Sequence, residues 1–354
     1  MDSLRIGLNA STIDGPFGGS NRFTKNLVKG LRHAGHYVTT RLEPGLDALF
    51  IIIAHDASRV TFSRLDAAAY KKAYPQTIVI QRINACDEQR GGNASQNQHI
   101  LAANRIADHT VFVSDFMRDF WAEHGIDDAA RQTTILTGAE TEIFHPAGGA
   151  VWNKREPFRL VTHHWSSNFL KGFDVYQRLD EMLARAPWRG RFEFTYVGNI
   201  PAGFRLKNAR HLPPADNDAL ADILRAHHGY VTAARLEPGG NHYIEAMQCG
   251  LPVLHLDHGS LPEYCAQYGV TFGLVDFAEK LEELRDRYDA LRAKVLTCPY
   301  SAETMAAGYA GLVERLVAER AGDAGASHPI SFRSYLLRKR LVSLRRRIGH
   351  RLAR

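Results

Sequence analysis

The sequence predicts an α/β protein built from two doubly wound, Rossmann-like domains, followed by a helical tail. Short apolar segments of strand length alternate with helical segments in two successive series along the chain. Such alternation is typical of parallel sheets that are covered by helices on both faces. A polar stretch bearing Gly and Pro, Glu140–Pro157, separates the two series. We therefore expect a first domain over residues 1–150, a second over 151–320, and a linker with a tail over 321–354.

The first series opens with an apolar segment, Leu4–Ala10, which has the length of a buried strand. A glycine-rich turn follows, and then Asn21–Ala34, in which apolar residues recur every three or four positions and Gly35 marks the helix end. The later elements expected in this domain are the strands Ala48–Ala54, Thr77–Gln81, His109–Val113 and Thr133–Leu136 and the helices Ala94–Ile106 and Asp115–His124.

The second series repeats this alternation, and a long helix, Ala302–Glu319, is expected to close the fold. Its other expected elements are the strands Phe158–Thr162, Phe192–Val197, Gly229–Ala233 and Pro252–Leu256 and the helices Phe173–Arg185, Asp218–His228 and Asn241–Cys249. Two such domains can face each other across a cleft. Because doubly wound sheets bind ligands at the carboxyl ends of their strands, we expect the functional site in that cleft.

Composition points to a folded protein in a reducing compartment. Hydrophobic residues make up 45% of the chain and charged residues 23%, which is the balance of a globular domain rather than a disordered segment. The four cysteines lack the spacing of a metal site or a disulfide framework. The N-terminal residues form no apolar signal segment, and no apolar run reaches the roughly 18 residues of a membrane span. We expect a cytoplasmic location.

The formal net charge of +6 comes from the C-terminal tail. Residues 332–354 contain nine Lys or Arg and no acid, so the rest of the chain carries −3. Apolar residues of the tail recur at spacings of three and four, namely Leu337, Leu341, Leu344, Ile348 and Leu352. This pattern predicts a basic amphipathic helix that favours an anionic membrane surface. A partner-binding helix or a disordered polybasic tail are the alternatives, whereas the acidic body argues against nucleic acid.

The turn after the first strand contains Gly15, Gly18 and Gly19, and Ser20 stands at the start of the following helix. Glycines let a ligand approach the backbone closely, and the free N–H groups of a helix N-terminus favour an anion. The turn lacks the full spacing of a dinucleotide-binding motif. From spacing alone, a simple surface turn is therefore an equal alternative.

A second glycine-rich turn carries two acidic residues, Glu237 and Glu245. A strand ends before Glu237, Pro-Gly-Gly follows, and Asn241 stands as a good N-cap of a short helix that contains Glu245. Both carboxylates can face one pocket beside the first-turn N–H groups of this helix. The arrangement suits a ligand with hydroxyls and phosphates. The alternative is a solvated Glu237 and a Glu245 that pairs with a nearby arginine.

The segment around these two residues resembles the Glu-x7-Glu donor motif of retaining GT-B glycosyltransferases of family 4, the glycosyl transferases group 1. Four further segments resemble landmarks of that family in the same order along the chain. They are the glycine loop Phe17–Ser20, the segment Leu136–Pro146 ahead of the domain crossing, the lysine segment Lys171–Asp174 and the turn Gly259–Glu263. The resemblance implies a GT-B fold, with an acceptor-binding first domain and a nucleotide-sugar-binding second domain.

The resemblance also implies roles for the matching residues. Glu237 would bind hydroxyls of the transferred sugar, Glu245 would bind the ribose, and Lys171 would neutralise the diphosphate. No metal or other cofactor is expected, because a fixed cation and oriented amides stabilise the leaving diphosphate. The donor-binding residues expected are Gly18, Gly19, Ser20, Ser166, Asn168, Lys171, Gly239, Gly240, Asn241, His242 and Glu245.

The sequence departs from the family ahead of the lysine. Family members have a Gly-Arg pair there, which supplies a second cation, whereas Thr162–Asn168 contains no arginine. The residues that could replace it are His163, His164, Ser166 and Asn168. Neutral donors stabilise a dianion less well than a cation does.

The first domain differs at a strand that in the family often ends in a sugar-contacting histidine. Here the corresponding stretch reads Val79-Ile-Gln-Arg82-Ile-Asn84. We expect Arg82 and Asn84 to point into the cleft, with Arg82 as a third catalytic residue beside Glu237 and Lys171, directed at the diphosphate or at an anionic acceptor. The alternative is an arginine that pairs with Asp87 or Glu88.

The resemblance therefore implies a retaining, metal-independent glycosyltransferase of the hexosyltransferase type, and we expect it to act on a saccharide or a lipid-linked acceptor. An epimerase or phosphorylase on the same scaffold is one alternative. Another is a degenerate protein that binds a sugar nucleotide or a partner without turnover, and the missing arginine supports it. A metal site is less favoured, because Asp216-Asn-Asp218 lies at a helix start where capping accounts for it.

Overall fold

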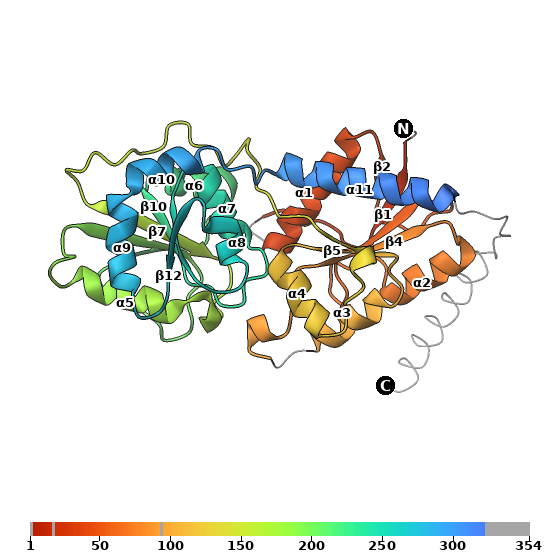
Figure 1. Cartoon of the computed structure of the whole chain (residues 1–354), viewed down its shortest axis with the longest axis horizontal. Helices are drawn as coiled ribbons and strands as arrows, with labels where there is room; N and C mark the ends of the chain where they lie inside the picture. Colours follow the sequence, from red (N-terminus) through yellow and green to blue (C-terminus); the bar gives the residue numbers. More distant parts are fainter. Residues whose placement is uncertain (1–2, 16–17, 93–94, 323–354) are drawn as a thin grey trace, which may run out of the picture.

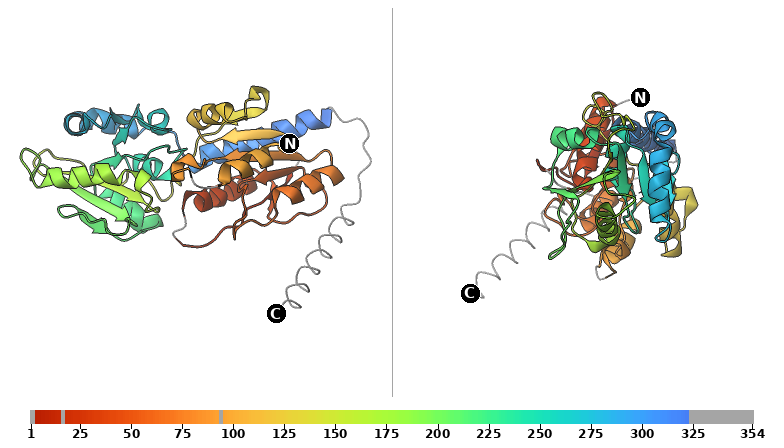
Figure 2. Two further views of the ribbon diagram at one scale, coloured as in Figure 1. Left: turned by 90° about the horizontal axis from the view of Figure 1, so that it is seen from below. Right: turned by 90° about the vertical axis from the view of Figure 1, so that its left-hand side faces the viewer.

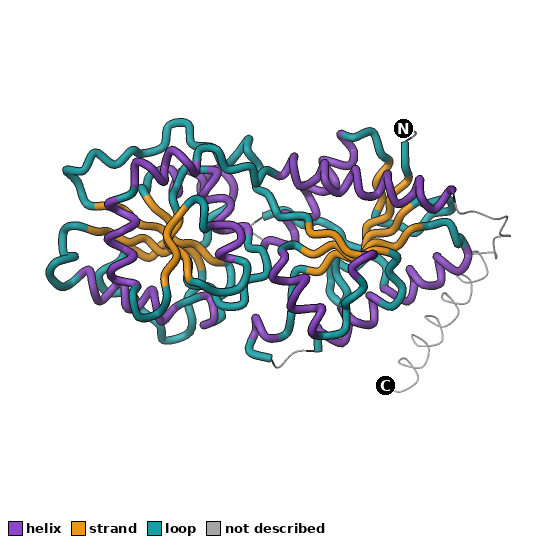
Figure 3. Tube along the Cα trace, in the orientation of Figure 1, coloured by secondary structure: helices purple, strands orange, loops and turns teal. Residues whose placement is uncertain are grey.

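The computed structural model describes residues 3–15, 18–92 and 95–322. Figure 1 shows two α/β domains side by side, and Figure 3 shows a layer of strands inside each, with helices on both sides. The two doubly wound domains predicted from the sequence are thus confirmed. The basic helix predicted over 332–354 lies outside the described residues, as does Phe17 of the glycine loop.

The first domain contains a six-stranded parallel sheet with the strand order β2-β1-β3-β4-β5-β6. Its strands are β1 (Arg5–Leu8), β2 (Tyr37–Thr39), β3 (Ala48–Ile51), β4 (Ile78–Ile83), β5 (His109–Phe112) and β6 (Gln132–Thr134). Ile6 lies opposite Ala48, and Ile80 lies opposite His109. The four residues of β3 and the six of β4 are all buried, as expected for strands that are covered on both faces.

Helices cover both faces of this sheet. They are α1 (Gly19–His33), α2 (Arg64–Ala73), α3 (Gln96–Asn104) and α4 (Asp115–Glu123), with the 3-10 turns η1 (Glu88–Arg90) and η2 (Ala129–Arg131). Ser63 and Ser114 begin α2 and α4, because each hydroxyl accepts a hydrogen bond from a first-turn N–H group. The apolar face of α1, which includes Phe23 and Leu27, packs on one side of the sheet.

The second domain repeats the design with the strand order β12-β11-β10-β7-β8-β9, again entirely parallel. Its strands are β7 (Phe158–His164), β8 (Phe192–Gly198), β9 (Arg210–Leu212), β10 (Gly229–Thr232), β11 (Val253–Leu256) and β12 (Gly269–Phe272). Its helices are η3 (Phe169–Lys171), α5 (Phe173–Leu183), α6 (Asn217–Arg225), α7 (Asn241–Gln248), α8 (Leu261–Cys265), α9 (Phe277–Asp286) and α10 (Tyr288–Val295). One continuous apolar core joins these elements.

The last described helix, α11 (Ala302–Gly322), returns to the first domain. Figures 1 and 2 show it in blue along the first sheet, beside α1. Its buried Tyr309 contacts Phe23 and Phe50 edge-on, with ring centroids 5.5 and 6.0 Å apart. The range 151–320 expected for the second domain therefore includes a helix that packs on the first.

The chain crosses between the domains twice, and the two crossings are hydrogen-bonded to each other. Ala139 donates its N–H group to Tyr300, and its carbonyl accepts from the N–H group of Ala302. Gly138 permits this approach, because a Cβ atom there would lie only 2.0 Å from the carbonyl oxygen of Ser301. The paired crossings hold the two sheets with their carboxyl ends facing one another.

Several short elements escape the sequence analysis, among them β2 and β9 with three residues each. Edge strands of this length carry too little alternation to be separated from loops. The helix expected to begin at Asn21 begins at Gly19 instead. Within the described ranges, no helix combines the length and the apolar character needed to cross a membrane.

Replacing Gly30 with alanine should destabilise the protein by about 1–3 kcal/mol, because overpacking forces helices apart. The new Cβ atom would lie 2.2 Å from the Cβ atom of Ala306, at the contact of α1 with α11. Urea unfolding measures the effect. Gly311→Ala is the control, since that helical position faces open space and alanine there should stabilise the helix by up to about 1 kcal/mol. Equal stability of Gly30→Ala and the unaltered protein would contradict this packing.

Candidate active site between the domains

A cavity of about 500 Å³ lies between the two domains, at the carboxyl ends of the strands of both sheets. Pockets of this size hold small molecules and cofactors. The thirteen residues proposed from the sequence all line it: Gly18, Gly19, Ser20, Arg82, Ser166, Asn168, Lys171, Glu237, Gly239, Gly240, Asn241, His242 and Glu245. Asn84 lines it as well.

Glu237 is held in the loop between β10 and α7 by unusual backbone geometry. Leu236, directly before it, has a φ of 49°, in the left-handed region that non-glycine residues rarely adopt. Leu236 donates its N–H group to Nδ1 of His258, and Ser260 donates its own to the carbonyl of Glu237. A Cβ atom on Gly259 would lie 2.6 Å from the backbone nitrogen of Glu237. The turn around Gly259 thus supports the loop that positions Glu237.

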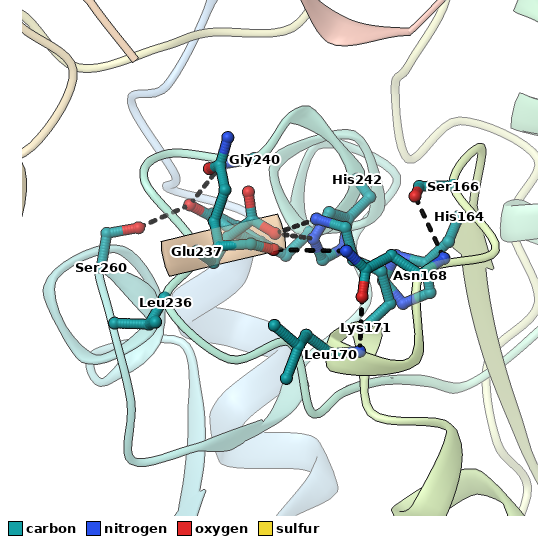
Figure 4. Close-up of polar contacts among 12 residues, drawn as sticks. His164, Ser166, Asn168, Leu170, Lys171, Leu236, Glu237, Gly240, His242 and Ser260 are labelled. Carbon is teal, nitrogen blue, oxygen red and sulfur yellow. Dashed lines mark hydrogen bonds and ion pairs between the residues drawn. The ribbon is translucent and has the colours of Figure 1, made fainter. Parts of the chain in front are cut away.

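Lys171 comes to the same place through a second glycine. Gly172 has a φ of 95°, and a Cβ atom there would lie 2.5–2.8 Å from Ala233. Only glycine fits at this position. Because it has no side chain, the lysine loop can pack directly against the end of β10. The Nζ atom of Lys171 then lies 2.6 Å from Oε2 of Glu237 (Figure 4). Asn168 supports this loop by accepting a hydrogen bond from the N–H group of Leu170.

The carboxylate of Glu237 is buried and charged. Burial alone would raise its pKa, but Lys171 and His242 outweigh burial and hold the pKa of Glu237 well below its ordinary value. His242 lies 3.6 Å from the carboxylate, and its own pKa is lowered by burial. The site therefore contains one ion pair and a neutral imidazole side by side.

Glu245 projects from α7 into the same cavity and is also buried. Its carboxylate lies 2.9 Å from Nε2 of His163 and 3.4 Å from Nε of Arg22. Burial would raise the pKa of Glu245, yet Arg22 and His163 lower it overall. The alternative considered from the sequence was a solvated Glu237 together with a Glu245 that pairs with an arginine. The structure shows the pairing of Glu245, but Glu237 is buried and not solvated.

Arg22 joins the first domain to the second. It stands in the first turns of α1 and reaches three carboxylates, those of Glu140 at 3.4 Å, Asp216 at 2.6 Å and Glu245 at 3.4 Å. The sequence analysis missed this residue. Its position three residues after Gly19, at the start of a helix that follows the first strand, is the signal that could have placed it in the site.

Two histidines occupy the place of the missing arginine, at the end of β7. His163 bonds to Glu245, and Nε2 of His164 lies 2.7 Å from the hydroxyl of Tyr176. Burial lowers the pKa of His164 well below its ordinary value, so its ring is neutral. Ser166 accepts a hydrogen bond from the N–H group of Asn168. His164 thus brings no charge to the site, and the segment Thr162–Asn168 contributes neither an arginine nor a lysine beside Lys171.

Two helix N-termini lie next to each other at the cavity. The first turn of α1 lies against that of α7, since a Cβ atom on Gly19 would lie 3.5 Å from the side chain of Asn241. The N-cap of α7 is Gly240 and not Asn241, which is the first helical residue. The caps Gly18 and Gly240 offer no side-chain acceptor. The first-turn N–H groups are therefore available to an anionic ligand, except that of Asn21, which donates to the carbonyl of Gly18.

Arg82 lies on the wall that the first domain contributes, at the next-to-last position of β4. Its guanidinium stacks on the ring of Phe23, 3.6 Å from the centroid. The alternative pairing with Asp87 or Glu88 is wrong: Asp87 accepts from the N–H groups of Gln96 and Asn97, and Glu88 accepts from the Asn97 side chain.

Comparison with known proteins identifies the fold. No family profile matches the sequence, and no curated protein matches it. Solved structures do match: the catalytic domain of starch synthase IV from Arabidopsis thaliana, bound to ADP and acarbose, gives a TM-score of 0.65 at 13% identity, over 90% of this chain and 100% of that one. The chain has the GT-B fold.

Two further GT-B structures are similar over almost the whole chain. Sucrose-phosphate synthase from Thermosynechococcus elongatus gives a TM-score of 0.61 at 17% identity, over 89% of this chain and 100% of that one. WaaG, a glycosyltransferase involved in lipopolysaccharide biosynthesis, gives a TM-score of 0.56 at 17% identity. The match covers 90% of this chain and 100% of that one. The GT-B fold implied by the resemblance in sequence is thus confirmed.

Among the described residues of this GT-B protein, no group of three or more His, Cys, Asp or Glu side chains is arranged to hold a metal ion. Asp216 acts as the N-cap of α6, accepts from the N–H group of Asn217 and binds Arg22. Capping therefore explains the Asp-x-Asp spacing, as the sequence analysis favoured.

Replacing Lys171 with methionine should destabilise the GT-B fold by about 3 kcal/mol at pH 8, because it leaves a buried carboxylate without its cation. The pKa of Glu237 should rise in this variant, so that protonation relieves part of the cost. The loss of stability should therefore be smaller at pH 5 than at pH 8. Urea unfolding at the two pH values measures the difference.

The matched control is Lys280→Met, which breaks a pair with Glu283 on α9. The lysines of the two pairs are equally exposed, at 27%, but the carboxylate of Glu283 is 30% exposed and that of Glu237 only 7%. The control should lose little stability at either pH, since water replaces an exposed partner. If Lys171→Met lost the same free energy of unfolding at pH 5 and pH 8, protonation of Glu237 would not be what relieves the destabilisation.

Proposed function

We propose that this protein is a retaining glycosyltransferase that transfers a sugar from a nucleotide-diphosphate sugar to an acceptor bound in the interdomain cavity. The observation that carries the proposal is the convergence of Glu237, Lys171 and two open helix N-termini in that cavity. This set provides acceptors for sugar hydroxyls and donors for phosphate oxygens within one site. The similar starch synthase structure contains ADP, a nucleotide of the kind proposed here.

The diphosphate is proposed to lie between the first turns of α1 and α7, next to Lys171. Negative charge gathers on the diphosphate as the bond to the sugar breaks. A fixed cation and oriented N–H groups stabilise this state more than the ground state. Lys171 and the backbone at Gly19 and Ser20 would supply this charge stabilisation in place of a metal ion.

The two glutamates are proposed to divide the rest of the donor between them. Glu237, which lies beside Lys171, would accept hydrogen bonds from hydroxyls of the transferred sugar. Glu245, one turn along α7, would hold the ribose, and Arg22 would have to share or release its carboxylate when the nucleotide binds. A saccharide or lipid-linked acceptor would approach from the first domain, and the basic residues 332–354 are proposed to hold the protein at an anionic membrane surface.

A protein that binds a sugar nucleotide without turnover is the second candidate. One observation favours it: His163 and His164 stand where the family has an arginine, and both are engaged with Glu245 and Tyr176. A single lysine already paired with Glu237 then bears most of the leaving-group stabilisation from the second domain. Turnover of a nucleotide sugar with an acceptor distinguishes the two functions.

A correct donor should raise the melting temperature of the protein. At about a hundred times its dissociation constant, a ligand stabilises the fold by roughly 2.7 kcal/mol, a shift of a few degrees. Thermal melting against UDP, GDP, ADP, CMP and dTDP sugars, with and without magnesium, provides the test. We expect one nucleotide class to stabilise the protein equally in both conditions. A panel without any stabiliser would contradict the proposed donor site.

Glu237→Gln and Glu245→Gln should separate the two ends of the donor. Glu237→Gln should weaken the nucleotide sugar about tenfold or more, because the sugar loses a charge-assisted hydrogen bond. It should not weaken the free nucleoside diphosphate, because Lys171 keeps its charge and loses a competing partner. Glu245→Gln should weaken both ligands. Isothermal titration measures the affinities, and Glu193→Gln, on the exposed side of β8, is the control. Loss of nucleoside diphosphate binding in Glu237→Gln would contradict its assignment to the sugar.

A further inference from the structure

The wall that the first domain contributes to the cavity carries uncompensated positive charge. Its lining side chains include three arginines and no acid: Arg22, Arg59 and Arg82. Arg22 is neutralised by three carboxylates. Arg59 hydrogen-bonds only to neutral groups among the described residues, namely the carbonyl of Ser11 and the side chains of Ser20 and Asn21.

Of these three arginines, Arg82 has the greatest need of a compensating partner, because its side chain is buried. The residue is 5% exposed, and its Nε and Nη1 atoms have no hydrogen-bond partner in the part of the chain that is described. The groups that influence it electrostatically are the hydroxyls of Tyr309 and Tyr264, which are uncharged, and burial lowers its pKa. The stacking on Phe23 offsets only a fraction of the free energy needed to take a guanidinium out of water.

A buried, unpaired cation is stable only if something in the functional state compensates it. The lining residues that follow Arg82 along the chain, Asn84 and Gln89, carry amides that hydrogen-bond to hydroxyls. The carbonyl of Gln89 lies 3.4 Å from Nδ2 of Asn168, in the loop that carries Lys171. This wall therefore faces the region where the proposed donor presents its sugar.

We infer that the acceptor is an anionic saccharide, and that Arg82 binds its phosphate or carboxylate group next to the accepting hydroxyl. The inference rests on the proposed transferase function and names the class of its second substrate. The donor diphosphate has its own partners in Lys171 and the first turns of α1 and α7. An anion on the acceptor would supply the partner that Arg82 lacks and would bring the sugar to the wall formed by Asn84 and Gln89.

The test compares binding of three sugars that differ in one group: glucose 6-phosphate, glucuronic acid and glucose. Isothermal titration is made with the unaltered full chain and with Arg82→Met. We expect at least one anionic sugar to bind the unaltered protein, glucose to bind more weakly, and Arg82→Met to weaken the anionic sugar about tenfold or more, as loss of a charged hydrogen bond predicts. Which anionic sugar binds distinguishes phosphate from carboxylate.

Arg178→Met is the matched control. Arg178 also stacks on a phenylalanine, Phe277, at 5.7 Å, but lies outside this cavity. The protein with this control substitution should bind the anionic sugars with the same affinity as the unaltered protein. In addition, ligand-free Arg82→Met should melt at a higher temperature than the unaltered protein, since an uncompensated charge has been removed. A structural role of Arg82 predicts the opposite shift.

Three outcomes would overturn the inference. Equal affinity of Arg82→Met and the unaltered protein for the anionic sugars is the first, and absence of binding to the unaltered protein up to about 10 mM is the second. The third is a loss of nucleoside diphosphate affinity in Arg82→Met, which would assign Arg82 to the donor. Failure of every nucleotide to bind, with anionic sugars still bound through Arg82, would instead reject the proposed donor site alone.

Discussion

The carboxylate of Glu237 lies inside the protein, and a buried negative charge is stable only where cations and hydrogen-bond donors surround it. Much of the local structure meets this condition. Gly172 lets the lysine loop approach the end of β10, and Gly259 lets a second loop support the backbone of Glu237. Lys171 and His242 then share the carboxylate. Three loops that are distant in the sequence are in this way fixed around a single atom group.

The two domains are fastened around the cavity at separate points. Arg22 binds carboxylates on one side. On another side, the hydroxyl of Ser114 donates to the carbonyl of Pro238, and the carboxylate of Glu263 accepts from the first N–H groups of α4. Burial raises the pKa of Glu263 despite these donors. The contacts named here are polar, and domains joined by polar contacts are expected to move relative to one another.

Local features of the site could be predicted from the sequence, whereas its long-range contacts could not. The turns around Lys171 and Glu237 are encoded by adjacent glycines and a strand end, so that short motifs place them correctly. The partners of Arg22 come from segments more than 100 residues away, and no local sequence pattern predicts such contacts. The return of α11 to the first sheet was missed for the same reason: its periodicity predicts a helix but not the domain on which it packs.

During synthesis, the first domain stays incomplete until the ribosome has delivered α11. Phe23 and Phe50 lack their contact with Tyr309 while the whole second domain is being made. The nascent protein therefore presents an apolar face for as long as residues 151–301 take to emerge, and such faces are binding sites for chaperones. The two domains, although separate in space, reach their final form in reverse order: the second can close first, and the first is completed by the last helix of the chain.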